Sequence, residues 1–150
     1  MKMLKVMALL SLLMLVVSCG GSKGATGAAK KYIIATDATY APFEFQENGK
    51  YIGIDVDLIT EIAKVEGFEF ELKPMDFGGI IPALQSGQVD AAIAGASITE
   101  ERKNTVDFSD PYYETGVVAV VRDDNTTIKT LEDLAGKRVA VKNGTEGAKL

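Results

Sequence analysis

Arg102 is the most informative of the residues that could carry chemistry. The sequence Thr99-Glu100-Glu101-Arg102 predicts a helix that begins after Thr99, which places Arg102 in its first turn. A cation at that position opposes the helix dipole, so its presence suggests a functional reason. A guanidinium beside the free N–H groups of a helix start is well suited to bind a carboxylate.

Other polar and aromatic residues follow predicted strands in the same way. Asp37 can accept hydrogen bonds from an ammonium or amide group, and the Gly144-Thr145 turn offers N–H groups and a hydroxyl. Tyr40 and Phe77 can enclose an aliphatic stem. Loops at the carboxyl ends of strands converge on one cleft in an open α/β sheet. Together these residues predict a site for a small zwitterion.

Each residue also has an ordinary structural interpretation. Arg102 can pair at the surface with a neighbouring carboxylate such as Glu100 or Asp107, and Asp37 can form a turn. The two aromatic side chains can belong to the core, and Lys142 can be a solvated surface lysine. The residues alone therefore indicate a small-molecule cleft and leave its ligand open.

Composition excludes several classes of function. The 150 residues carry a net charge of −5 without a basic cluster, which argues against a nucleic acid as partner. The absence of His removes Ser-His-Asp and Cys-His catalysis and most zinc sites. We expect no catalytic residue, no metal and no cofactor. The single Cys permits no internal disulfide.

The first part of the chain has the features of an export signal. Lysines at positions 2 and 5 precede an apolar run over residues 6–17. This run is too short to cross the core of a bilayer, which requires a helix of about 20 residues. Small residues then precede Cys19, which resembles the lipobox of bacterial lipoproteins. We expect residues 1–18 to be removed and Cys19 to carry lipid; an ordinary signal peptide is the alternative. Residues 19–31 are rich in Gly and Ala and predict a flexible tether.

Strand and helix patterns alternate after the tether, which predicts an α/β fold with a mainly parallel sheet. An Asn48-Gly49 pair predicts a hairpin turn. Apolar patterns predict strands over residues 32–36, 68–73, 89–95, 117–121 and 138–141, that at 117–121 being buried. Helix patterns and caps predict helices over residues 55–66, 79–86, 99–106 and 130–135, with another opening after the turn at 143–147.

Six sequence blocks resemble the bacterial family 3 extracellular solute-binding proteins, which serve polar amino-acid ABC importers. The resemblance covers nearly all of residues 32–148, in order and with family spacing. The blocks are TDATYAPFEF (36–45), GIDVDL (53–58), FGGIIPAL (77–84), GASITEER (95–102), VDFSDPYY (106–113) and VAVKNGT (139–145).

The resemblance implies a periplasmic-binding-protein-like fold of type II, with two lobes that close on the ligand. Residues 32–115 would form most of lobe 1, and residues 116–150 a hinge strand and the start of lobe 2. We therefore expect the chain to be the N-terminal part of a larger protein, which alone would bind free amino acids weakly or not at all.

The resemblance also assigns roles to individual residues. Arg102 would bind the α-carboxylate, Gly95 and Ser97 would hold the α-amino and carboxylate groups, and Thr145 would cap the carboxylate from lobe 2. Asp37, Tyr40 and Phe77 would line the side-chain pocket. Residues 71–77, together with Lys142, are most like the glutamine-binding members, in which Asp37 and Lys142 would meet the side-chain amide.

The implied function is an envelope receptor without catalysis. It would deliver an amino acid, glutamine above all, to the membrane subunits of an ABC permease. It would act as a monomer, anchored through Cys19 to the outer face of the cytoplasmic membrane or lying in the periplasm. Two alternatives remain: a cyclohexadienyl or arogenate dehydratase on the same fold, and the ligand-sensing module of a larger receptor.

Overall fold

A three-stranded parallel sheet forms the centre of the computed structural model, which describes residues 30–149. Its strands are β1 (Lys31–Thr36), β5 (Glu69–Pro74) and β6 (Ala91–Ala92), in the order β5-β1-β6. β1 pairs with β5 over its whole length but with β6 at only two positions, Ile34–Ala91 and Ala35–Ala92. The α/β prediction is confirmed, whereas the strand expected over residues 89–95 is much shorter.

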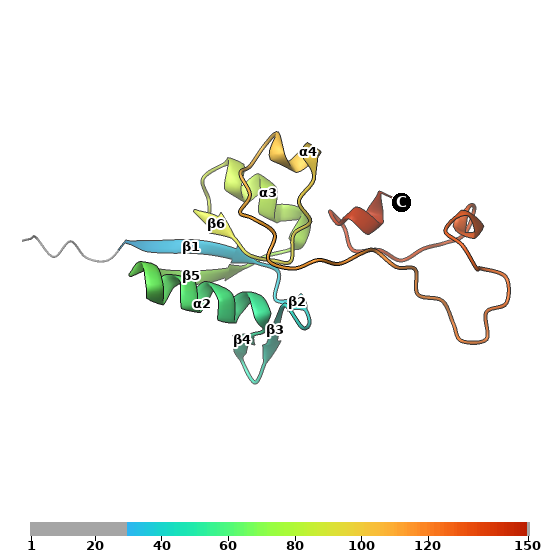
Figure 1. Ribbon diagram of the computed structural model, residues 1–150, viewed down its shortest axis with the longest axis horizontal. Coiled ribbons are helices and arrows are strands. Elements are labelled where there is room, and N and C mark those ends of the chain that lie inside the picture. The colour runs from blue at the N-terminus through green and yellow to red at the C-terminus, as the bar shows by residue number, and fades with distance from the viewer. Residues whose placement is uncertain (1–29, 150) are drawn as a thin grey trace, which may run out of the picture.

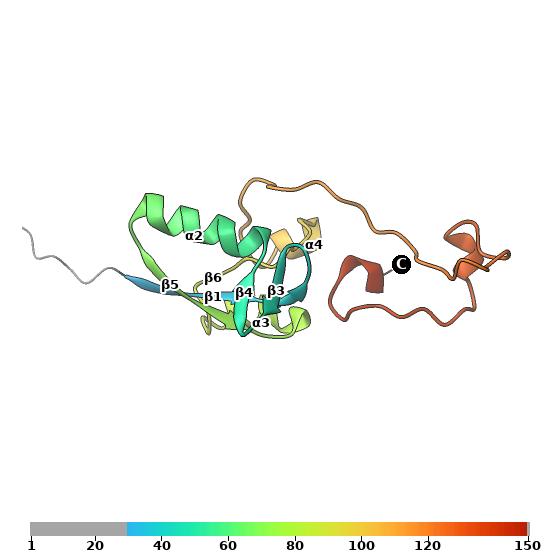
Figure 2. The same ribbon diagram turned by 90° about the horizontal axis from the view of Figure 1, so that it is seen from below.

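Two helices cover opposite faces of this sheet (Figures 1 and 2). Alternation along β1 directs Ile34 and Ala35 to different faces. Ile34 packs in one buried cluster with Ile59 of α2 (Ile54–Glu66), and Ala35 packs in the other with Ile80 of α3 (Phe77–Gln85). The sheet is thus held between two apolar layers, and its strand ends remain free to carry the site.

The hairpin and the first long helix follow the sequence closely. β2 (Thr39–Tyr40), β3 (Glu44–Glu47) and β4 (Lys50–Ile52) form an antiparallel sheet. Asn48 and Gly49 turn between the last two strands with φ of 50° and 77°, the positive values that this tight turn requires. α2 ends at Gly67, whose left-handed conformation lets its N–H bond to the carbonyl of Ala63.

The later helices are shorter than predicted. α4 spans Glu100–Lys103, capped by the Thr99 hydroxyl, and stops before residue 106. The regions expected to be helical near residues 130 and 146 are single 3₁₀ turns, η1 (Glu132–Leu134) and η2 (Glu146–Ala148). Local capping signals therefore located the starts of these turns correctly. A longer helix also needs an apolar face packed against the rest of the fold, because capping alone does not stabilise several turns.

The predicted strands over residues 117–121 and 138–141 are wrong. Both segments are extended but unpaired, and the first leaves the sheet for the outlying part of the chain (Figure 1). Val118 and Val120 are 78% and 90% exposed, so the expected buried strand is absent. The run of valines suits a strand, but a strand also needs a neighbour for its backbone groups, and residues 30–149 provide none here.

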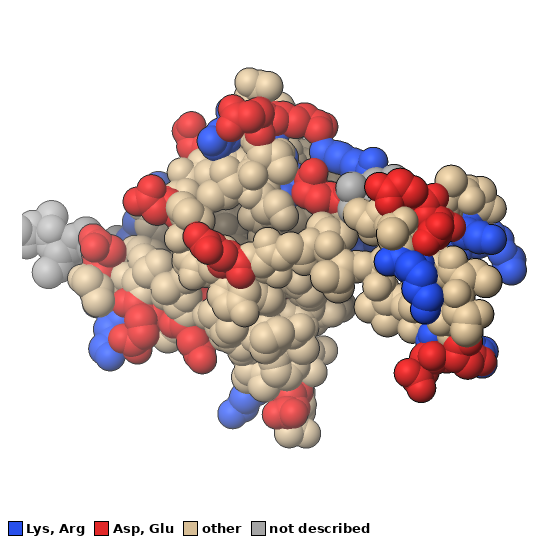
Figure 3. Space-filling model, turned by 45° about the vertical axis from the view of Figure 1, so that its right-hand side comes forward, with Lys and Arg blue, Asp and Glu red and all other residues tan. Residues whose placement is uncertain are grey.

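The face shown in Figure 3 is largely uncharged at its centre, with acidic and basic side chains scattered around it and no continuous basic patch. None of the helices in residues 30–149 combines the length and apolar character that crossing a bilayer requires. The predicted signal segment and Cys19 lie outside the described residues.

Candidate functional site

The ends of β1 and β5 bring Asp37 and Phe77 together. The two strands run in parallel with Thr36 opposite Pro74, so the chain leaves both at the same sheet edge. Asp37 follows β1 directly and is 7% exposed, and Phe77 begins α3 three residues after Pro74, the last residue of β5. The Phe77 backbone amide lies near the Asp37 carboxylate and is the smallest of the groups that lower its pKa.

Lys142 reaches Asp37 from the far end of the described chain. Its Nζ lies 2.5 Å from Oδ1 of Asp37 and 2.7 Å from Oγ1 of Thr39, which itself donates to the same carboxylate oxygen. Burial alone would raise the pKa of Asp37, but the hydrogen bonds from Lys142 and Thr39 outweigh it and hold that pKa below its ordinary value. Lys142 is thus a partner of Asp37, although 42% of its side chain remains exposed to solvent.

Arg102 is buried, 8% exposed, and its guanidinium faces inward. Nη1 donates to the Ser97 carbonyl at 2.7 Å and Nη2 to the Gly144 carbonyl at 2.8 Å. The guanidinium carbon lies 5.4 Å from the centre of the Phe77 ring. The surface pair expected as an alternative, with Glu100 or Asp107, does not form. Arg102 instead lies 3.5 Å from a carboxylate oxygen of Glu146.

Tyr40, Gly95 and Ser97 line a common pocket, together with Tyr112 and other residues of the 111–115 segment. Gly95 has φ of 53°, and a Cβ there would lie 3.1 Å from the Tyr40 ring, so both its conformation and its contact favour Gly. Tyr40 stacks on Phe43 at 5.2 Å between ring centres. The Tyr40 side chain is therefore fixed by packing at the pocket wall.

Thr145 closes the turn that carries Lys142. Its hydroxyl donates to the Lys142 carbonyl at 2.8 Å, and its N–H makes a longer bond to the same oxygen. Gly144 approaches α3 so closely that a Cβ there would lie 2.7 Å from the Gly78 Cα. The 142–146 segment is therefore docked against the ends of the sheet.

The predicted binding residues fall into two linked groups. The first is a set of contacts around the Asp37–Lys142 pair, made by Asp37, Phe77, Arg102, Lys142 and Thr145. The second is Tyr40, Gly95 and Ser97, which line the pocket, whereas the first group does not; the bond from Arg102 to the Ser97 carbonyl connects the two. Within residues 30–149, no group of three His, Cys, Asp or Glu side chains is arranged to hold a metal ion.

Sequence reasoning missed a buried acidic pair beneath the pocket. Glu44 is 1% exposed, and among residues 30–149 neither of its carboxyl oxygens has a hydrogen-bond partner. Burial and the neighbouring Asp55 carboxylate raise the pKa of Glu44 to about 9. Asp55 accepts hydrogen bonds from the Gly95 N–H and the Tyr112 hydroxyl. Burial and Asp55 also raise the pKa of Tyr112. The position of Glu44 between Phe43 and Phe45 was the available signal.

Residues 32–148 match the family of bacterial extracellular solute-binding proteins, family 3. The chain belongs to this family. It is 43% identical over 129 residues to the arginine-binding extracellular protein ArtP of Bacillus subtilis (strain 168), covering 85% of this chain and 50% of that protein. This family 3 chain thus spans about half the length of the curated relatives it matches.

Solved structures of similar proteins agree with this assignment. An ancestral arginine-binding protein bound to arginine is 55% identical, with a TM-score of 0.76 over 79% of this chain and 53% of that one. A second structure, bound to glutamine, gives 0.75 at the same identity and coverage. The ancestral amino acid-binding protein AncCDT-1, a precursor of cyclohexadienyl dehydratase, is 47% identical with a TM-score of 0.65, over 69% of this chain and 47% of that one. The family 3 chain therefore has part of the type II periplasmic-binding-protein fold.

Proposed function

We propose that this chain carries the first part of a receptor that binds a polar amino acid outside the cytoplasm and delivers it to an ABC permease. The observation that carries the proposal is the inward-facing guanidinium of Arg102, connected through Phe77 to the paired Asp37 and Lys142. A zwitterion needs such a pair of sites: a cation for its carboxylate and polar groups for its other end. The amino-acid-binding relatives support the same class of ligand.

Within this proposal, Arg102 binds the α-carboxylate, with the nearby Gly95, Ser97 and Thr145 completing that end of the site. Asp37, Tyr40 and Phe77 surround the side chain. Lys142 favours a neutral amide such as that of glutamine, because its ammonium would repel a second cation beside Asp37 while an amide can accept from the lysine and donate to the aspartate. An ancestral relative was solved with both arginine and glutamine, so both ligands belong in the test.

Transport and not catalysis is the proposed activity, with the receptor as a monomer held at the membrane by lipid on Cys19. A dehydratase is the second candidate, because AncCDT-1 is similar to this chain. Incubation of the full gene product with prephenate or arogenate, followed by absorbance of the aromatic product, separates the two. Turnover above a no-protein control would support the enzyme.

A thermal-shift panel of the twenty amino acids on the full gene product tests the receptor proposal. Ligands that bind only the native state raise the melting temperature with affinity and concentration. We expect glutamine to give the largest rise, with smaller rises for other polar amino acids. The absence of any rise at millimolar concentrations would contradict the proposal.

A further inference from the structure

We propose that Glu146 is a built-in competitor for the carboxylate of the ligand. The Glu146 carboxylate pairs with the guanidinium of Arg102 when the site is empty. Glu146 has to move away before a ligand carboxylate can bind the guanidinium. This inference rests on the proposed function, because it takes Arg102 as the carboxylate receptor.

Glu146 is the charged neighbour of a guanidinium that otherwise meets neutral acceptors. Nη1 and Nη2 of Arg102 donate to the carbonyls of Ser97 and Gly144, which take up two of its five N–H groups. Oε1 of Glu146 lies 3.5 Å from Nη2, and the two side chains are only 27% and 9% exposed. The Glu146 carboxylate therefore lies at the position where Arg102 would attract the carboxylate of a ligand.

The contact is loose enough to be exchanged. Oε1 of Glu146 is buried without a hydrogen-bond partner in the described part of the chain, and its two ion pairs there, to Arg102 and Lys149, measure 3.5 and 3.3 Å. Good charge-assisted hydrogen bonds measure about 2.7–2.9 Å. A ligand carboxylate that met Arg102 at that shorter distance would gain more than Glu146 loses, particularly if Glu146 turned outward to water.

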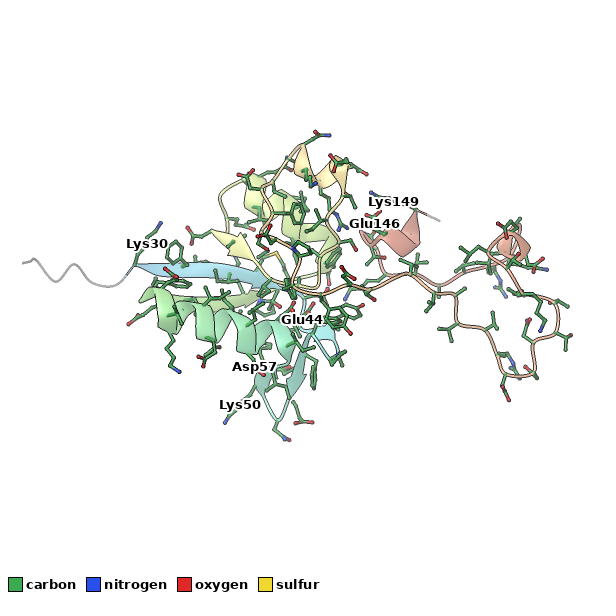
Figure 4. The ribbon with its side chains drawn as sticks, in the orientation of Figure 1. Lys30, Glu44, Lys50, Asp57, Glu146 and Lys149 are labelled. Atoms are coloured by element: carbon green, nitrogen blue, oxygen red, sulfur yellow. The ribbon has the colours of Figure 1, made fainter. Side chains whose placement is uncertain are left out.

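Lys149 allows this exchange without undocking the chain. Glu146 and Lys149 both extend from η2 (Figure 4), and Nζ of Lys149 lies 2.5 Å from Oε2 of Glu101 on α4. That second ion pair does not involve Arg102. Release of Glu146 therefore leaves η2 tied to α4. Glu100 offers a matched control for loss of one negative charge on α4, because it is 90% exposed and pairs with Lys103.

Acetate is the probe for the chain of residues 1–150, because its binding requires no amino-acid side-chain pocket. The side-chain Nε–Hε NMR signal of Arg102 is followed as acetate replaces chloride at constant ionic strength, in the wild type, Glu146→Gln, Glu146→Ala and Glu100→Gln. We expect both Glu146 variants to reach half-saturation at about threefold or more lower acetate, and Glu100→Gln to stay within about twofold of the wild type.

Equal midpoints in the wild type and both Glu146 variants would overturn the proposal, and so would an equal decrease in Glu100→Gln, which would indicate a general charge effect. The amino-acid panel is an independent measurement. A lower acetate midpoint without any amino-acid binding would retain the competition at Arg102 and reject the proposed ligand. Amino-acid binding with unchanged acetate midpoints would support the proposed ligand class and reject the competition by Glu146 at Arg102.

Discussion

The Nζ of Lys142 lies 2.5 Å from Oδ1 of Asp37, although 105 positions separate the two residues in the sequence. The aspartate is almost wholly buried and the lysine partly exposed, with side-chain exposures of 3% and 42%. A ligand side chain that approaches Asp37 therefore also meets a positive charge. This pair sets the electrostatic preference of the side-chain pocket in the proposed receptor.

Replacing Lys142 with Met should shift the ligand preference from glutamine toward arginine. Two cations about 4 Å apart repel by about 4 kcal/mol at an effective dielectric constant of 20. Recovering a third of that energy would change the ratio of the two affinities about tenfold. Calorimetric titration of both amino acids into the full gene product gives this ratio.

Lys137→Met is the matched control, since Lys137 is exposed in the same part of the chain. It removes the same charge far from Asp37 and should leave the ratio unchanged. An unchanged ratio in Lys142→Met as well would mean that the pair does not set the preference.

Arg102→Ala should weaken amino-acid binding by about 2–5 kcal/mol, because the ligand carboxylate would be left without its charged partner. That loss corresponds to roughly 30-fold to several thousand-fold in Kd. Calorimetry measures it, with Arg122→Ala as control because Arg122 pairs only with Asp124 at the surface. A loss below about threefold would remove Arg102 from the role of carboxylate receptor.

The strand ends around Asp37, Phe77 and Arg102 could be predicted because local signals were sufficient. Alternating strands and helices place Asp37 and Phe77 at one sheet edge, and the Thr99 cap fixes Arg102 within its turn. The positions of these residues depend on regular sheet geometry and on a local cap, although Asp37 and Phe77 are 40 positions apart. Their individual roles were predicted from the family resemblance.

Features that depend on distant partners were missed. The valines near residue 118 predict a strand, but their state depends on a pairing neighbour that the sequence pattern does not reveal. The sequence analysis did not single out Glu44, because a charged side chain is exposed on average. Its burial beside Asp55 depends on distant segments: Asp55 is itself bonded to Tyr112, 57 positions away.

Cys19→Ser should release the protein from membranes. Cys19 lies outside the described residues, and the prediction follows from its position after an apolar signal-like run. A serine cannot form the thioether that would hold the lipid on this residue. Fractionation of cells into membrane pellet and soluble envelope extract measures the change, and a variant that still pellets with lipid would refute the anchor.

Gly95→Ala should destabilise the protein more than Gly87→Ala. Both glycines have positive φ, 53° and 68°, so each alanine incurs a backbone cost of about 1–2 kcal/mol. A Cβ at residue 87 meets nothing within 4 Å, whereas at residue 95 it would lie 3.1 Å from the Tyr40 ring. We expect about 1 kcal/mol of additional loss in the free energy of unfolding at residue 95, measured by urea titration.

Tyr40→Ala separates the contact from the backbone strain. Combined with Gly95→Ala, it should reduce the cost of the alanine to that seen at Gly87. A cost at residue 95 that is the same with and without the ring would show that Gly95 is needed for its conformation alone and does not fix Tyr40 at the pocket wall.

Glu44→Gln should flatten the dependence of stability on pH. Burial and the Asp55 carboxylate raise the pKa of Glu44 from 4.5 to about 9, so the native state keeps a proton that the unfolded state releases above its ordinary pKa. The stability of the wild type therefore falls as pH rises between about 4.5 and 9, by up to about 1.4 kcal/mol per pH unit. Gln is close in shape and does not titrate, so its melting temperature should decrease less between pH 5 and pH 8. The control is Glu47→Gln, on the exposed end of the same strand, whose melting temperature should change with pH as in the wild type. The same decrease in melting temperature for all three proteins would mean that Glu44 is ionised in the native state at pH 8.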